Sequence, residues 1–342
     1  MHRALSAAHR RGIGIAVLLG LAFAAALPAA ADVALFAPEI NLVAATDGGG
    51  DWRDSAGAQR TSIGFESYGR RSGDLGDFLA WDLQVRLSHD STEPTDDTWS
   101  IEIHNAWIEY RIALGRRVRV GHFSPAFGLE HDVDTHATLL QTLAGRDIGF
   151  KKDWGIAYQT AAGPFDATLA VQLGSGAPVA AREGSHLTTM RLATPPGRGS
   201  RFGASLLAGH VLETRGARTW PASEAPTATS KLRVGLDGER SIGPVRVSGE
   251  VTVGRDEDAG VVGALLWADL AVPLLRDLTI ETQGRTWSDD RLRSGSRRTS
   301  AAVGASLRMT AHCTLRAVVE RALEAPRDEP NVIAFQIYYY GG

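Results

Sequence analysis

Cysteine and lysine are almost absent from this chain, and long apolar runs are confined to its N-terminus. The single cysteine, Cys313, cannot form an internal disulfide, so the fold is stabilised in other ways. Only three of the 36 basic residues are lysines, Lys151, Lys152 and Lys231, and the rest are arginines. After Asp32, no apolar run reaches the roughly 20 residues of a membrane-spanning helix, so no such helix is predicted there.

The first 31 residues have the layout of a secretory signal peptide. Three arginines precede an apolar run from Gly12 to Leu27, and Ala29 and Ala31 follow as small residues. This order predicts cleavage before Asp32 and export from the cytoplasm. An uncleaved helical anchor is the alternative, although the run is short for one.

The mature chain carries a negative net charge. Without the three arginines of the signal, 33 basic residues stand against 39 acidic ones, which gives a net charge of −6. Because a polyanion binds chiefly through basic side chains, no nucleic-acid partner is expected.

Apolar and polar side chains alternate through most of the mature chain. In Leu79–Leu87 the apolar residues are separated by Ala80, Asp82, Gln84 and Arg86, and the same period of two recurs at 165–173 and 245–253. This period is typical of strands with one apolar and one polar face. About 16 such segments of roughly ten residues follow one another, and that length crosses a bilayer as a tilted strand. The only helical candidate is short, at Thr138–Leu143.

Short and long connections alternate between these segments. The short ones are predicted at 71–77, 113–116, 161–164, 194–200, 241–244, 273–277 and 310–312, and the mostly longer ones at 47–60, 89–98, 124–150, 174–186, 213–230, 255–260, 288–298 and 323–330. This order predicts an all-β fold, a transmembrane antiparallel up-and-down β-barrel over 32–342 with periplasmic termini. A large soluble β-protein is the alternative, but it leaves the charged strand faces unexplained.

Seven tryptophans lie mainly near the predicted strand ends, where aromatic side chains suit the two membrane interfaces. These residues are Trp52, Trp99, Trp107, Trp154, Trp220, Trp267 and Trp287. Within Trp99–Ile112 the apolar positions change phase, which predicts a β-bulge near Asn105. Glu102 and His104 are then expected to face the lumen before the bulge, and Glu109 and Arg111 after it.

A barrel of about 16 strands cannot fill its interior with its own strand side chains, so an aqueous lumen is expected. The longest connection, 124–150, is also the third long one, a position from which general porins fold a loop inward. It is the candidate constriction loop.

The segment Val118–Glu130 resembles the stretch that enters the third loop in the phosphate-selective porin O/P family. The resemblance extends loosely from Trp99 to about Gly174 and includes Arg146–Gly149. It implies an outer-membrane porin, a homotrimer, with anions among its solutes. Two features depart from that family: three lysines cannot make its lysine-rich lumen, and the chain does not end on an aromatic residue.

Placing the polar strand faces inward gives nine basic and six acidic lumen candidates, a mildly cationic wall that would attract anions. The candidate pore-lining residues are Arg86, Glu102, Arg117, Arg119, Arg233, Arg246, Glu250, Glu281, Arg285, Arg308 and Arg316, with Lys231, Asp82, Asp166 and Glu320 completing the count. Pairing of these charges between neighbouring strands is the alternative. Arg117 and Arg119 share one face just before the loop and could bind one passing anion together.

Acidic and imidazole side chains gather within the candidate constriction loop, at Glu130, His131, Asp132, Asp134 and His136. His131, Asp134 and His136 could meet around a divalent ion, but their spacing matches no metal motif, so no metal site and no cofactor are expected. Acidic residues that line a pore mouth are the alternative.

The predicted function is therefore passive diffusion of small polar or anionic solutes through an outer-membrane barrel that contacts lipid and lipopolysaccharide. Two other classes stay open: an outer-membrane barrel enzyme, and a surface-anchoring structural barrel with a closed lumen. No Gly-x-Ser-x-Gly motif is present to supply a serine nucleophile, and no enzymatic activity is expected.

Overall fold

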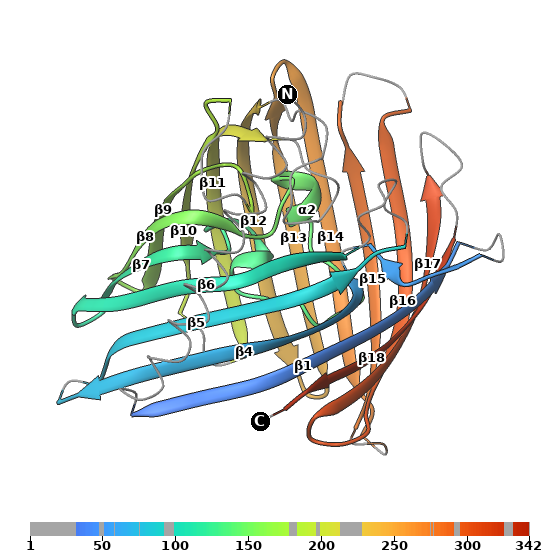
Figure 1. Cartoon of the computed structure of the whole chain (residues 1–342). Coiled ribbons are helices and arrows are strands. Elements are labelled where there is room, and N and C mark those ends of the chain that lie inside the picture. Colours follow the sequence, from blue (N-terminus) through green and yellow to red (C-terminus); the bar gives the residue numbers. More distant parts are fainter. Residues whose placement is uncertain are drawn as a thin grey trace, which may run out of the picture.

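The described chain forms one closed antiparallel barrel (Figure 1). The computed structural model describes residues 32–341 apart from 48–50, 58, 75, 92–98, 178–182, 196–198, 213–227, 274, 276, 291–294 and 325–330. The predicted signal peptide, 1–31, and Trp220 lie outside the described residues.

Sixteen long strands are seen in the described part, which confirms the predicted fold class. They are β1 (Val33–Thr46), β4 (Gln59–Gly73), β5 (Gly76–His89), β6 (Trp99–Ala113), β7 (Arg116–Phe123), β8 (Asp153–Ala162), β9 (Phe165–Gln172), β10 (His186–Ala193), β11 (Ser200–Leu212), β12 (Ala228–Ile242), β13 (Val245–Asp256), β14 (Ala259–Ala271), β15 (Leu278–Ser288), β16 (Arg297–Arg308), β17 (Cys313–Glu324) and β18 (Val332–Tyr340). Two short strands, β2 (Trp52–Arg53) and β3 (Ser55–Ala56), lie in the first long connection.

The barrel closes where the first strand meets the last. β1 pairs with β18 from Glu39↔Tyr340 to Thr46↔Ile333, and each other long strand pairs with its neighbours in the chain. Closure gives every long strand in the described ranges a partner strand on both sides, which a membrane-spanning sheet requires because lipid offers backbone groups no hydrogen bonds.

The period of two separates an apolar outer face from a polar inner face. On β9, Leu169 and Val171 are 47% and 51% exposed on the outside, whereas Thr168 and Gln172 are buried on the inside. Such strands form because alternate side chains point to opposite faces, so one face can contact lipid while the other contacts water or polar groups.

The connections divide the barrel into two ends. The short-turn end carries the tight connections, such as 114–115 and 163–164, together with both described termini; the long-loop end carries the longer ones. The predicted long connection at 255–260 is wrong, because β13 and β14 are joined by the two residues Glu257 and Asp258 alone. No helix in the described ranges is long and apolar enough to cross a membrane.

The predicted β-bulge is confirmed. Pairing between β5 and β6 passes from Gln84↔Asn105 to Val85↔Ile103, so His104 has no partner residue opposite it. Glu102 and His104 are buried inside the barrel before the bulge and Glu109 after it. The pairing is therefore irregular at this point, and Trp107 shares the inner face with Glu109, as alternation beyond the bulge requires.

Residues 124–150 fold into the barrel interior and contain the short helices η2 (Leu129–His131) and α2 (Ala144–Asp147) (Figure 1). The predicted helix at Thr138–Leu143 is wrong, since the helical turn begins only at Ala144. The three leucines of that stretch instead lie against the barrel wall. The three leucines share one apolar side of the loop, although the backbone there is not helical.

Three apolar clusters attach this loop to the wall. Leu129, Leu140 and Leu143 pack on inward side chains of β14, β16 and β17, among them Leu265 and Trp267. Phe127, Ile148 and Phe150 pack on Leu187 of β10 and on Leu207 and Val211 of β11, and Phe123 and Ala126 pack on Ala157 and Ala170. Each buried leucine or phenylalanine side chain contributes about 1.5–3 kcal/mol of transfer free energy, so the loop is held firmly.

The predicted placement of the tryptophans near the membrane interfaces is wrong for three of them. Trp107, Trp267 and Trp287 face the interior, where Trp267 belongs to the apolar cluster under Leu140 and Leu143. For Trp267 the reason is the inward loop, which offers Leu140 and Leu143 for its ring to cover.

Candidate pore and constriction loop

The bend of the loop at His136 is bound to the barrel wall through this side chain. Its Nε2 lies 2.7 Å from Gln84 Nε2 and 3.0 Å from the hydroxyl oxygen of Tyr338, and 3.4 Å from a carboxylate oxygen of Glu39. Arg86 contacts the same carboxylate and donates to the backbone oxygen of His136 at 3.3 Å. Because β1, β5 and β18 supply these groups, the bend lies at the seam of the barrel.

A second anchor is the ion pair between Asp147 and Arg233. Both side chains are fully buried, and Arg233 Nε lies 3.3 Å from Asp147 Oδ1. Arg233 also donates to Asp256 at 2.5 Å. Nearby, Glu250 is 3% exposed and stands so close to Gly128 that a Cβ at that glycine would lie 1.9 Å from its Oε1. Gly128 has a φ of 61°, so both space and backbone require glycine there.

The interior of the loop is organised around Glu130. Its carboxylate accepts hydrogen bonds from the hydroxyls of Thr135 at 3.1 Å and Thr142 at 2.5 Å. Lys151 donates to Thr135 Oγ1 at 2.6 Å and contacts Gln141. Burial raises the pKa of the Glu130 carboxyl and lowers the pKa of the Lys151 ammonium, because both charges are removed from water.

Asp132 connects the loop to β10 and β11. Its two carboxylate oxygens each lie 2.8 Å from a guanidinium nitrogen, one of Arg191 and one of Arg201. Asp134, in contrast, has a half-exposed side chain and accepts from the backbone nitrogen of His136 at 3.0 Å. The surrounding protein interior opposes ionisation of Asp134 even though the side chain is half-exposed, but Lys152 and the hydrogen bonds from His136 hold its pKa well below the ordinary value.

His131 lies on the other side of the loop from His136, beside Asp132 and Arg201, and burial lowers its pKa to about 3. The structure thus brings Asp134 and His136 together and leaves His131 apart. Among the described residues, no group of three or more His, Cys, Asp or Glu side chains could hold a metal ion.

All three lysines of the chain anchor this loop, which the sequence analysis missed. Lys151 binds within it, Lys152 donates to Asn105 on β6 at 2.8 Å, and Lys231 lies 3.5 Å from the backbone oxygen of Asp147. The signal was present in the sequence: two of only three lysines are adjacent at the end of the longest connection. A flexible cationic side chain reaches carbonyl and amide oxygens inside the barrel.

Most of the predicted basic pore-lining residues are paired with acidic residues. Arg117 and Arg119 both bind Glu109, at 3.1 Å and 2.7 Å, and Arg119 also stacks on the ring of Trp107 at 4.2 Å. The two arginines that were expected to bind a passing anion thus already share a carboxylate of the chain itself. This is the cross-strand pairing that was the alternative at the sequence level.

The remaining predicted wall residues divide into those under the loop and those near water. Arg86, Glu102, Arg233 and Glu250 are buried, and Arg60 binds Glu102 at 2.5 Å. Nearer the short-turn end or exposed to the interior are the pairs Arg246–Asp269 (2.5 Å), Arg308–Asp277 (3.0 Å), Arg285–Glu320 (2.5 Å), Glu281–Ser306 (2.5 Å) and Arg316–Gln336 (3.1 Å).

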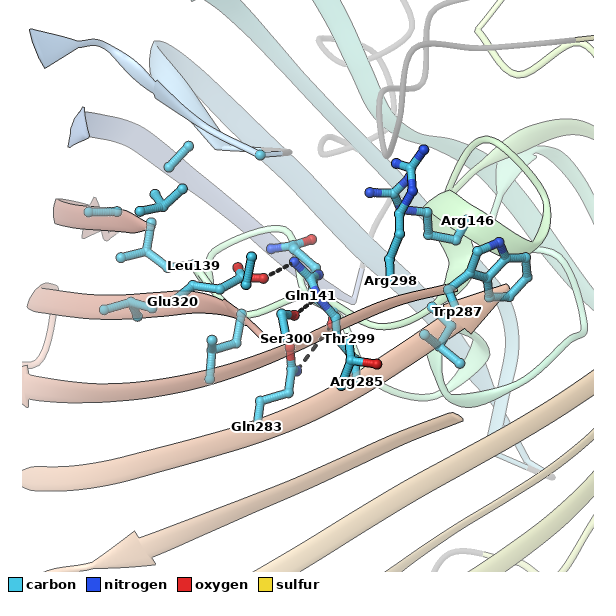
Figure 2. A pocket seen from close by; sticks show the side chains of 18 of the residues that line it. Leu139, Gln141, Arg146, Gln283, Arg285, Trp287, Arg298, Thr299, Ser300 and Glu320 are labelled. Carbon is cyan, nitrogen blue, oxygen red and sulfur yellow. Dashed lines mark hydrogen bonds and ion pairs between the residues drawn. The ribbon is translucent and has the colours of Figure 1, made fainter. Parts of the chain in front are cut away.

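A cavity of about 380 Å³ opens on the long-loop side of the loop and is called here the arginine cavity (Figure 2). Four arginines line it, Arg53, Arg146, Arg285 and Arg298, and Glu320 is its only acidic lining residue among those described. Its apolar lining residues include Leu139, Leu140 and Leu143 of the loop and Val318, Val332 and Ala334 of the wall. Figure 2 shows Arg285 bound to Ser300 and Glu320 in the centre of the cavity.

A second cavity of about 260 Å³ lies on the short-turn side and is called here the Glu109 cavity. It is lined by Glu109, Arg117, Arg119 and Asp166 from β6, β7 and β9, and by His131 and Asp132 of the loop. The loop therefore separates two charged cavities that face opposite ends of the barrel.

The sequence of β14 carries a further signal for the inward loop. The run Ala259–Ala271 is almost continuously apolar and does not alternate. Its inner residues Val261, Leu265 and Trp267 are buried, two of them under loop leucines, while Leu266 is exposed outside. A strand covered on both faces is apolar on both, so this run marked the wall that the loop covers.

Comparison with known proteins finds similar solved structures but no matching family. No family model matches the chain, and no curated protein matches its sequence. Among solved structures, the anion-selective porin from Comamonas acidovorans is 12% identical, with a TM-score of 0.61 over 90% of this chain and 99% of that one. The fold is that of the outer-membrane porins.

Two further solved structures agree. OmpF of Salmonella typhi is 12% identical, with a TM-score of 0.66 over 90% of this chain and 97% of that one. OprB of Pseudomonas putida is 11% identical, with a TM-score of 0.60 over 90% of this chain and 94% of that one. These matches support a porin fold in general, and the narrower resemblance to the phosphate-selective porin O/P family stays a prediction.

Proposed function

We propose that this chain is an outer-membrane porin through which small polar or anionic solutes diffuse passively. The observation that carries the proposal is a loop, 124–150, folded into a closed barrel of sixteen long strands with a charged cavity on each side of it. In this proposal the short-turn end faces the periplasm and the long-loop end faces the outside.

The polar inner wall favours a pore over a packed core. A soluble barrel that only fills its interior has no use for charged side chains such as Arg246, Glu281 and Arg316 along the inner face. These side chains are at least partly exposed in the interior. A wall of this kind keeps water in the lumen and lets charged solutes pass at low cost.

Anions are the preferred solutes in this proposal. The arginine cavity has four guanidinium groups and one carboxylate among its lining residues, and two further carboxylates, of Asp47 and Asp289, lie 3.8 Å from Arg53 and 3.9 Å from Arg298. The remaining excess of positive charge lies between low-dielectric walls that focus the field. At the other side of the loop the charges balance more closely, since Glu109, Asp132 and Asp166 accompany Arg117, Arg119 and Arg201. The long-loop side therefore sets the preference, and loop 124–150 forms the constriction.

The barrel is also proposed to contact lipid and lipopolysaccharide through its outer face and to assemble as a homotrimer. Large apolar side chains such as Phe36, Leu236 and Leu266 are about 60% exposed on that face. One structural neighbour, OmpT of Vibrio cholerae, was solved in a trimer form at 10% identity, with a TM-score of 0.62 over 90% of this chain and 99% of that one.

Recording single channels in a planar bilayer under a salt gradient tests this function. The folded mature chain should give steady conductance steps with a reversal potential that favours chloride over potassium. Folded protein that inserts but never conducts would rule the pore out and leave the closed structural barrel or the barrel enzyme. A pore that prefers potassium would overturn the anion preference alone.

A further inference from the structure

The arginine cavity combines two properties that an inorganic anion does not use together. Its charged part is formed by Arg53, Arg146, Arg285 and Arg298, which come from four separate elements. Arg285 binds Glu320 closely, whereas Arg53 and Arg298 lie only 3.8 Å and 3.9 Å from the carboxylates of Asp47 and Asp289. Its apolar part is continuous with the cluster of Leu140, Leu143, Trp267 and Val318 beneath it. Trp287 adds an aromatic ring to the wall, as Figure 2 shows.

We propose that the arginine cavity binds small organic carboxylates with a compact apolar body, such as benzoate. This inference depends on the proposed function in one respect, which is that solutes enter the barrel from the long-loop end. A carboxylate presents two oxygens in the plane that a guanidinium fork matches, and the apolar body of the solute meets Leu139, Val332 and Ala334.

The lining favours this class over two other simple solutes. Inorganic phosphate can use the guanidinium groups, but it is strongly hydrated and gains nothing from the apolar lining residues. A neutral sugar can accept hydrogen bonds from the arginines, but it has no charge that would strengthen them. A volume of about 380 Å³ accepts a single-ring acid and lies at the small end of ligand pockets.

Polar groups between the two halves fix the orientation of the solute. Arg285 is already held by Ser300 at 3.0 Å and by Glu320 at 2.5 Å, so its guanidinium is positioned before a solute arrives. Gln283 donates to the backbone oxygen of Gln141 at 3.1 Å and ties the loop to the cavity wall. The cavity is thus formed in advance, which lowers the entropy lost on binding.

Calorimetric titration of the detergent-solubilised barrel tests the proposal without requiring conduction. Benzoate should bind at least about tenfold more tightly than acetate, because the ring adds buried apolar surface. Benzyl alcohol and inorganic phosphate should each bind more weakly than benzoate, since each has only one of the two features.

Three variants make the test specific. Arg298→Gln should weaken benzoate binding about tenfold or more by removing a charge-assisted contact. Val332→Thr, which is nearly isosteric, should weaken benzoate and leave acetate unchanged. Arg321→Gln should change neither, because Arg321 lies on the exposed outer face next to Glu320 in sequence.

Each outcome separates this proposal from the proposed function. Equal affinity for benzoate and acetate, or tighter binding of phosphate or benzyl alcohol, would overturn the carboxylate site even if the barrel conducts. Benzoate binding with the predicted pattern in a barrel that does not conduct would support the site and reject the porin.

Discussion

At the scale of single residues, pairing dominates the interior of this barrel. Polar inner-face positions could be predicted from alternation, because a strand exposes every second side chain to the same side. The partners of those side chains could not. Glu109, which holds Arg117 and Arg119, and Asp147, which holds Arg233, are brought to their arginines by strand register and by the inward loop.

The pairing of Arg117 and Arg119 with Glu109 gives a prediction about ion selectivity. Replacing both arginines by alanine leaves Glu109 without its two cations in the Glu109 cavity. The reversal potential under a salt gradient should therefore move toward cations, and Glu109→Gln should move it toward anions. Equal reversal potentials in all three proteins would show that this cavity lies off the ion path.

The buried pair of Asp147 and Arg233 gives a prediction about loop stability. Arg233→Ala leaves the Asp147 carboxylate buried without its cation, at a cost of about 3–5 kcal/mol. We expect the loop to detach locally while the barrel persists, because the strands keep their ladder. Protease cleavage within 124–150 should increase, with no loss of the compact band on unheated gels.

Arg70→Ala is the matched control for that variant. Arg70 binds Asp77 at 3.1 Å, but both side chains are 44% exposed at the short-turn end. Exposed pairs of this kind are worth about 0–1 kcal/mol. Cleavage that rises equally in both variants would contradict a specific role for the buried pair.

At the scale of elements, the strands follow from the sequence and the path of loop 124–150 does not. Period-two segments predicted the strands, and the phase change in Trp99–Ile112 located the bulge at His104. The loop was predicted by its length and order. Its contacts with β10, β14 and the β1–β18 seam join residues far apart in the chain, which no local pattern encodes.

Glu130 makes the attachment of this element depend on pH. Because burial raises the pKa of its carboxyl, the attached loop binds the proton more tightly than an exposed chain does. The protonated Glu130 carboxyl therefore stabilises the attached loop. This stabilisation is complete below the ordinary pKa of 4.5 and is lost as pH rises through the raised pKa. Hydrogen exchange in 128–143, corrected for intrinsic rates, should therefore accelerate from acid to neutral pH in the wild type.

The Glu130→Gln variant isolates this carboxyl. Glutamine keeps the shape and the acceptor for Thr135 and Thr142 but cannot ionise. The acceleration of exchange from acid to neutral pH in the same segment should then be clearly smaller than in the wild type, with the part that persists due to neighbouring groups such as Asp132. A variant with the wild-type pH profile would assign the effect to another group.

At the scale of the whole molecule, the seam between β1 and β18 turns a meander into a barrel. A chain ending at Glu324 lacks β18, so β1 and β17 are left with unpaired edges that lipid cannot satisfy. This variant should give no compact band on unheated gels and no membrane insertion. Replacing Glu257–Asp258 by Asn-Gly, a favoured two-residue hairpin turn, should leave the compact band unchanged.

The fold class and the number of strands could be predicted at this scale, because both depend on repeated local patterns. The inward third loop was predicted from its length and its place among the long connections. The distribution of charge could not, because it depends on which inner side chains the loop covers. Four arginines remain around the arginine cavity, while Arg86 and Arg233 are buried under the loop.

The most direct test of the central claim is the single-channel conductance of a barrel without its loop. Phe123 pairs with Asp153, so the ends of β7 and β8 are adjacent and a short Gly-Ser linker can replace 125–151. If the chain is a porin narrowed by this loop, the wild type conducts and the shortened barrel conducts several-fold more. A folded, inserted pair of proteins with the same conductance, or with none, would contradict it.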